Sequence, residues 1–138
     1  MKRAMLLKIG ILCAFAGLTV PVSAQSGTTI KLKGEVPFAF VSSDRTMPSG
    51  QYSVEIRQEQ VRFLDAHGQP VQVVVSNPQQ DSGRDEQPRL VFHRYGETYI
   101  LWQIWTRDHK VDFRRSRTEY SLKANRQVEP GTVILAMR

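Results

Sequence analysis

The stretch that decides the fold is Val36–Ile56, which reads VPFAFVSSDRTMPSGQYSVEI. It holds two runs in which apolar and polar residues alternate, separated by a polar segment rich in turn-forming residues. Because the side chains of a β-strand alternate between two faces, this pattern predicts two half-buried strands. In the segment between them, Pro48 presets φ and Gly50 can adopt a positive φ, as a tight turn requires.

The first of these strands extends back along the chain, because the same alternation covers residues 30–40. We therefore predict one long strand there, in which Pro37 marks a sheet edge or a bulge, since proline cannot donate a hydrogen bond to a neighbouring strand. Residues 61–64 and 70–76 predict a hairpin with Gly68 in its turn. Residues 132–137 predict a final apolar strand, which could pair near the first strand and cover an edge.

One short helix is expected after Ser116, because Ser116 and Glu119 have the spacing of a capping box. Taken together, the elements predict an all-β fold, either an antiparallel small barrel or a two-sheet sandwich of about seven or eight strands with one short helix.

Residues 90–105 are the most apolar part of the chain after its first 24 residues. With a two-residue loop at Tyr95 and Gly96, Arg94 would lie opposite Glu97 in a hairpin. Trp102 and Ile104 would then share the core face, and Trp105 would lie on the other face. Both faces are apolar, so either the hairpin is covered on both sides or one face presents an aromatic patch to a partner. We favour the first alternative.

Three motifs together resemble a family of small secreted bacterial proteins of unknown function. They are VPFAFV at residues 36–41, MPSGQYSV at 47–54 and LVFHRYGETY at 90–99. The family pattern runs VPFxFxV, LPAGxYxV and LVFHRYGxxY, and this chain departs from it mildly at Met47, where the pattern has Leu, and at Ser49, where it has Ala. The resemblance covers most of the chain after residue 24. It implies export and an all-β fold, and it implies no activity.

The N-terminus has the features of a secretory signal peptide. Lys2, Arg3 and Lys8 supply positive charge around an apolar run, and Val22–Ala24 is a small-x-small cleavage site. The run is shorter than the roughly 20 residues that span a bilayer. We therefore predict a signal peptide over residues 1–24, cleavage after Ala24, a single β domain over 25–138 without a transmembrane segment, and a secreted or periplasmic location.

Cleavage would change the composition of the chain. The signal peptide holds three of the 19 basic residues and none of the 13 acidic ones, so 16 − 13 leaves a net charge of +3. The single cysteine, Cys13, would also be removed. The mature domain would then have no disulfide, no cysteine-based metal site and no thiol nucleophile.

The residues that could act as nucleophiles, as acids or bases, or as metal ligands form no recognisable catalytic or metal-binding pattern. His67, His93 and His109 lack metal-ligand spacing, and His93 is expected to be a hydrogen-bonded, partly buried residue. The chain has no Gly-x-Ser-x-Gly turn and no glycine-rich phosphate loop. We therefore predict no catalytic, cofactor-binding or metal-binding residue and no enzymatic activity.

One local cluster predicts an interaction surface. Arg114, Arg115 and Arg117 form a basic run, and Trp105 lies nearby in the sequence. Export argues against a nucleic acid partner, so an envelope protein or an anionic polymer is the expected partner. We predict a binding or structural accessory protein of the cell envelope that acts through a sheet edge or this aromatic and basic surface. The alternative is a small barrel that carries an apolar ligand, although we favour a filled interior.

Overall fold

The computed structural model describes residues 27–76, 78–80, 87–126 and 129–138. The predicted signal peptide and its cleavage site therefore lie outside the described residues. Across the described residues the chain forms strands β1 to β11 and one helix, α1.

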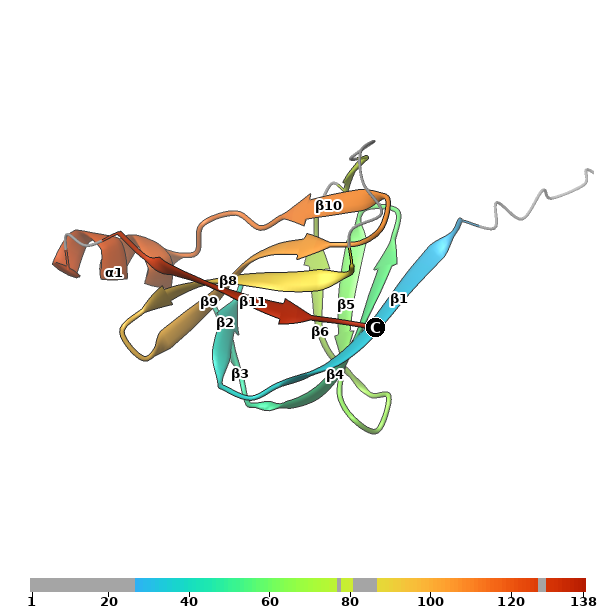
Figure 1. The fold of residues 1–138 in the computed structure, drawn as a ribbon, viewed down its shortest axis with the longest axis horizontal. Coiled ribbons are helices and arrows are strands. Elements are labelled where there is room, and N and C mark those ends of the chain that lie inside the picture. The colour runs from blue at the N-terminus through green and yellow to red at the C-terminus, as the bar shows by residue number, and fades with distance from the viewer. Residues whose placement is uncertain (1–26, 77, 81–86, 127–128) are drawn as a thin grey trace, which may run out of the picture.

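Two sheets make up the fold (Figure 1). The first sheet has the order β1-β4-β5-β6, and all of its neighbours are antiparallel. Its strands are β1 (Thr29–Val36), β4 (Gly50–Arg57), β5 (Gln60–Leu64) and β6 (Pro70–Val75). The second sheet has the order β11-β8-β9-β10-β7, and β2 joins it as a parallel neighbour of β9 while pairing with β3. Its strands are β2 (Phe40–Ser42), β3 (Arg45–Met47), β7 (Gln79–Gln80), β8 (Arg89–Tyr95), β9 (Thr98–Trp105), β10 (His109–Asp112) and β11 (Gly131–Ala136).

The predicted all-β class with one short helix is confirmed, and the arrangement is a sandwich rather than a closed barrel. In the part of the chain that the structure describes, β6 and β11 remain at the outer edges of their sheets. The described residues form eleven strands rather than the predicted seven or eight. The additional strands β2, β3 and β7 are only two or three residues long, too short to show an alternating pattern.

The predicted long strand over residues 30–40 is wrong at its second half. It ends at Val36, and the chain passes into the second sheet at Phe40. Pro37 explains the break, since it has no N–H to donate to a ladder. Ser43 and Asp44 then turn the chain back with φ of 46° and 67°, the two positive values of a type I′ hairpin turn.

The core lies between the sheets and is filled by side chains of both. Val54, Val61 and Phe63 come from the first sheet, and Phe40, Phe92 and Ile104 from the second. All six are at most 1% exposed. Phe40 meets Tyr52 and Phe92 edge to face, with ring centroids 5.5 Å apart in both pairs. The packing supports the filled interior that the sequence favoured.

The β8–β9 hairpin differs from its prediction by one residue. Tyr95 pairs with Thr98, so the loop is Gly96 and Glu97, and Arg94 lies opposite Tyr99 rather than Glu97. A bulge between Val91 and Phe92 leaves Trp102 without a partner in the register. Because the extra residue shifts the alternation, Leu101 and Ile104 are both buried while Trp102 and Gln103 are partly exposed. The prediction of Trp102 in the core is therefore wrong.

Helix α1 (Arg117–Arg126) begins where the sequence predicted, with the Glu119 N–H donating to the Ser116 hydroxyl at 3.1 Å. The helix lies at one end of the sandwich (Figure 1). Leu122 packs there against a second cluster formed by Val41, Tyr95 and Ile100. The helix therefore covers part of the hairpin's outer face, as the first alternative for this hairpin required.

Candidate functional site

Trp105 lies on the outer face of the second sheet, as predicted. Its Nε1–H donates to Gln103 Oε1 at 3.0 Å. The Arg89 guanidinium and the Lys110 ammonium lie 4.8 and 5.5 Å from the centre of its ring, a cation–π arrangement. The side chain is only partly exposed. Trp105 is thus held by neighbours from β8 and β10.

The three predicted arginines lie elsewhere. Arg114 and Arg115 follow β10, are exposed, and line the same hollow. Arg117 is the first residue of α1, and its backbone N–H donates to Asp44 Oδ1 at 2.7 Å. Trp105 does not line that hollow. The structure therefore brings Arg114 and Arg115 together and separates them from Trp105.

This hollow, which we call the seam hollow, opens between the two sheets and has a volume of about 670 Å³. Ligand clefts commonly span about 300–1,000 Å³. One wall is the end of β6, another is the segment that joins β10 to α1, and a third is the β2–β3 turn. The lining residues are Ser43, Asp44, Glu59, Val74, Val75, Ser76, Gln79, Asp112, Phe113, Arg114, Arg115 and Ser116.

Strand β6 borders the seam hollow with a free edge. Its only strand neighbour among the described residues is β5. The Ser76 N–H donates to the Glu59 carbonyl at 2.7 Å, beside the Val75–Gln60 pair. Because hydrogen bonds alternate along an antiparallel ladder, the N–H and C=O groups of Val74 face β5, and those of Val73 and Val75 face the free edge.

The same two residues expose apolar side chains. Val73 is 53% exposed and Val75 is 77% exposed, and both belong to the outer face of the first sheet, opposite Arg62 and Gln60. β6 carries no charged residue. Natural edge strands usually carry charges or a covering segment that blocks pairing with another chain. Within β6 itself, such protection is confined to Pro70 at the start of the strand.

The charged side chains that line the seam hollow differ in whether they have a bonding partner. Asp44 accepts the Arg117 N–H, and Asp112 accepts Gln103 Nε2–H at 2.7 Å and lies 3.4 Å from Lys110 Nζ. Within the described residues, neither Arg114 nor Arg115 forms an ion pair. Within the described residues the hollow therefore has two exposed arginines without an ion pair, and Glu59 is its carboxylate without a side-chain partner.

Two side-chain hydrogen bonds cross the gap near the hollow. Gln72 Nε2–H donates to the Ser42 carbonyl at 2.7 Å, and the Ser76 hydroxyl donates to the Asp112 carbonyl at 3.3 Å. Gln72 Oε1 and Ser42 Oγ are buried and have no hydrogen-bond partner within the described structure. Buried polar atoms are normally paired. Some buried hydrogen-bonding groups at the junction between β6 and the second sheet therefore lack a partner in the described structure.

A second polar cluster, formed by Glu119, His93 and Tyr95, is linked by side-chain hydrogen bonds. Glu119 is buried beneath α1, and its Oε1 lies 2.7 Å from His93 Nδ1 and accepts the Tyr95 hydroxyl at 3.1 Å. His93 also stacks on Trp102, with ring centres 4.3 Å apart. Burial, followed by the Glu119 carboxylate, raises the pKa of Tyr95 above its ordinary 10.0. The prediction that His93 is a hydrogen-bonded, partly buried residue is confirmed.

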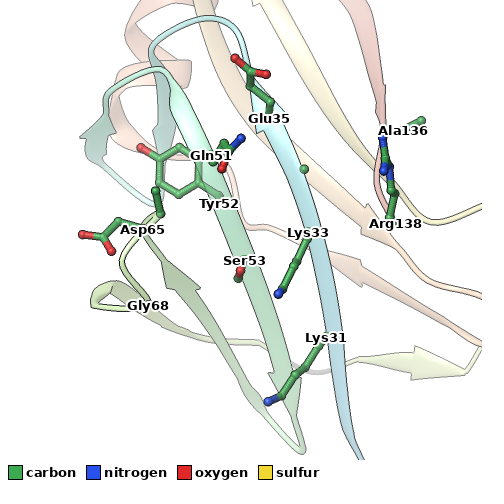
Figure 2. A pocket seen from close by; sticks show the side chains of 12 residues that line it. Lys31, Lys33, Glu35, Gln51, Tyr52, Ser53, Asp65, Gly68, Ala136 and Arg138 are labelled. Atoms are coloured by element: carbon green, nitrogen blue, oxygen red, sulfur yellow. The ribbon is translucent and has the colours of Figure 1, made fainter.

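Another open hollow, of about 1060 Å³, lies at the opposite side of the first sheet. Figure 2 shows its basic side chains, Lys31 and Lys33 on β1 and Arg138 at the chain end, together with Glu35 and Asp65. Tyr52 lines it as well, with its hydroxyl donating to the Pro48 carbonyl. Charges of both signs are spread over this hollow, so its chemistry favours no single class of ligand.

Metal ligands do not gather anywhere in the described ranges, where no group of three or more His, Cys, Asp or Glu side chains could hold an ion. No helix of the described chain is long and apolar enough to cross a membrane. None of the family models, curated proteins or solved structures compared with the chain matches it. The resemblance to secreted proteins of unknown function therefore stays a prediction.

Sequence reasoning missed the edge position of β6 and the partner of His93. The VQVVV run predicted a strand, and nothing local to it indicates which strand lies beside it. The capping-box spacing identified Glu119 as a helix-start residue, and its side chain instead reaches a strand 26 residues earlier in the chain.

Proposed function

We propose that this chain is an exported binding or structural accessory protein of the cell envelope, which accepts an extended segment of a partner protein along β6. The observation that carries the proposal is the free edge of β6, with its exposed valines, beside the seam hollow. Strand addition of this kind uses main-chain hydrogen bonds for affinity and side-chain contacts for specificity. The signal-peptide features of the first 24 residues support export.

The other functional readings receive less support. An apolar ligand would need an interior cavity, whereas the space between the sheets is occupied by side chains such as Phe40, Phe63 and Phe92, all at most 1% exposed. An anionic polymer would use the arginines and leave the edge of β6 without a role. The absence of enzymatic activity remains a prediction from the sequence.

A nuclear magnetic resonance titration tests the proposal. The probe is a short peptide that alternates valine and threonine, and the control is the same peptide with alternate backbone nitrogens methylated. We expect the unmodified peptide to shift the amide signals of Val73 and Val75 and the methylated peptide to shift neither. Equal effects of both peptides, or shifts confined to other strands, would contradict strand addition.

A pair of substitutions at one position sharpens the test. Val75→Pro removes an N–H that faces the free edge and leaves the β5 ladder intact, because edge positions tolerate proline when their N–H points away from the sheet. Val75→Thr keeps that N–H and a β-branched side chain. We expect Val75→Pro to weaken peptide binding and Val75→Thr to preserve it. Binding that survives Val75→Pro would place the peptide elsewhere.

A further inference from the structure

We infer that the segment accepted by β6 alternates apolar residues with acidic ones, and that Arg114 and Arg115 bind its acidic side chains. This inference rests on the proposed function, since it describes the partner of the same edge. It follows from the exposed side chains of Val73 and Val75 and from the two arginines of the seam hollow, which Val74 and Val75 both border.

The apolar half of the pattern follows from the outer face. An added strand continues the alternation of β6, so every second side chain would lie beside Val73 and Val75 on the outer face of the first sheet. Those two side chains are largely exposed in the free protein. An apolar side chain at each of these positions would cover them and remove apolar surface from water.

The acidic half follows from the inner side of the same edge. Val74 belongs to the opposite face of β6 and lines the seam hollow together with Arg114 and Arg115. The alternate side chains of an added strand would therefore point into the hollow. Asp112 is paired with Lys110, and Asp44 accepts the first N–H of α1. Among the described lining groups without an ion pair or capping contact, Arg114 and Arg115 outnumber Glu59, so the two guanidinium groups are available to an acidic partner.

The experiment compares three probes on the full mature chain. Each is a short peptide with valine at alternate positions, and its remaining central positions hold glutamate, glutamine or lysine. We expect the glutamate peptide to bind about tenfold more tightly than the glutamine peptide at low salt, the combined effect of two exposed ion pairs. High salt should remove most of that difference, because it screens exposed charges.

Charge reversal of Arg114 and Arg115 to glutamate should turn the preference toward the lysine peptide. The matched control reverses Arg107 and Lys123, which are also exposed and do not line the hollow. This control should leave the preference for glutamate unchanged. An equal change in both double variants would show that the effect is one of net charge and would overturn the inference.

The outcomes separate this inference from the proposal on which it rests. If the glutamate and glutamine peptides bind equally and Val75→Pro weakens both, strand addition stands and the acidic partner is wrong. If the preference for glutamate survives both Val75→Pro and backbone methylation, the arginines bind acidic groups without strand addition and the proposed function fails. Polygalacturonate is an acidic polysaccharide without backbone amide groups. If it bound as tightly as the glutamate peptide, that result would likewise contradict strand addition.

Discussion

The two sheets meet along two seams that differ in how they are joined. At the first seam, Lys33 of β1 and Arg138, which follows β11, exchange two backbone hydrogen bonds of 2.9 Å. At the second seam, between β6 and the segments around β2 and β10, the hydrogen bonds come from the side chains of Gln72 and Ser76. We call these the closed seam and the open seam.

Packing follows the same division. At the closed seam Met137 is 1% exposed and fits against Gly34, where an added Cβ would lie 2.3 Å from the methionine sulfur. A larger residue at position 34 would therefore force the buried Met137 side chain to move, so glycine favours the close packing of the two segments. At the open seam a hollow of about 670 Å³ remains, and Val75 is 77% exposed. Backbone pairing with close packing closes one seam, and isolated side-chain contacts leave the other available to a partner.

The largest effect is expected at the closed seam. Met137→Ala should lower the free energy of unfolding by about 2–5 kcal/mol, because it removes a buried side chain and leaves a cavity against Gly34. Ile134→Ala is the control, because Ile134 lies three residues before Met137 in β11 and its side chain is 60% exposed, and this change should cost much less. Chemical denaturation measures both. A similar small loss for the two variants would show that the closed seam contributes little.

A smaller effect is expected at the satisfied polar cluster under α1. Glu119→Ala would leave His93 Nδ1 and the Tyr95 hydroxyl without the carboxylate that binds them. We expect a loss of about 1–3 kcal/mol in the free energy of unfolding, the typical cost of unpaired buried polar groups. Lys123→Ala, an exposed change on the same helix, is the control. An unchanged stability would mean that the cluster does not hold the helix.

Substitutions at the open seam should change the free energy of unfolding least. Gln72→Leu removes the hydrogen bond to the Ser42 carbonyl, and it also removes a buried oxygen that has no partner in the described structure. These contributions oppose each other, so we expect a change of about 1 kcal/mol or less. Ser42→Ala, which deletes the other unpartnered atom, should be neutral or slightly stabilising. A loss as large as that of Met137→Ala would erase the distinction between the seams.

Local patterns in the sequence predicted most elements of this fold. Alternation identified the strands, and the Ser116–Glu119 spacing identified the start of the helix, because both depend on residues close together in the chain. The sequence predicts an edge or a bulge at Pro37 inside one strand, whereas the chain changes sheets there. That choice depends on which strand offers a neighbour, which short-range alternation does not encode.

The candidate site was predictable only in part. Arg114 and Arg115 were identified as a basic surface, and they line the seam hollow. Proximity in the sequence also places Trp105 in this predicted surface, although β10 separates Trp105 from the two arginines. The bulge beside Trp102 changed the faces of the residues around it, and a one-residue shift of this kind cannot be read from an apolar run on both faces. The edge position of β6 depends on the whole strand order.

Amide hydrogen exchange along β6 tests the central claim most directly. In the free protein, we expect the Val73 and Val75 amides to exchange rapidly and the Val74 amide, bonded to β5, to be protected. The glutamate peptide should then protect Val73 and Val75 while leaving Val74 unchanged. Protection of all three amides in the free protein, or no added protection at Val73 and Val75 with the peptide bound, would contradict an open seam that accepts a strand.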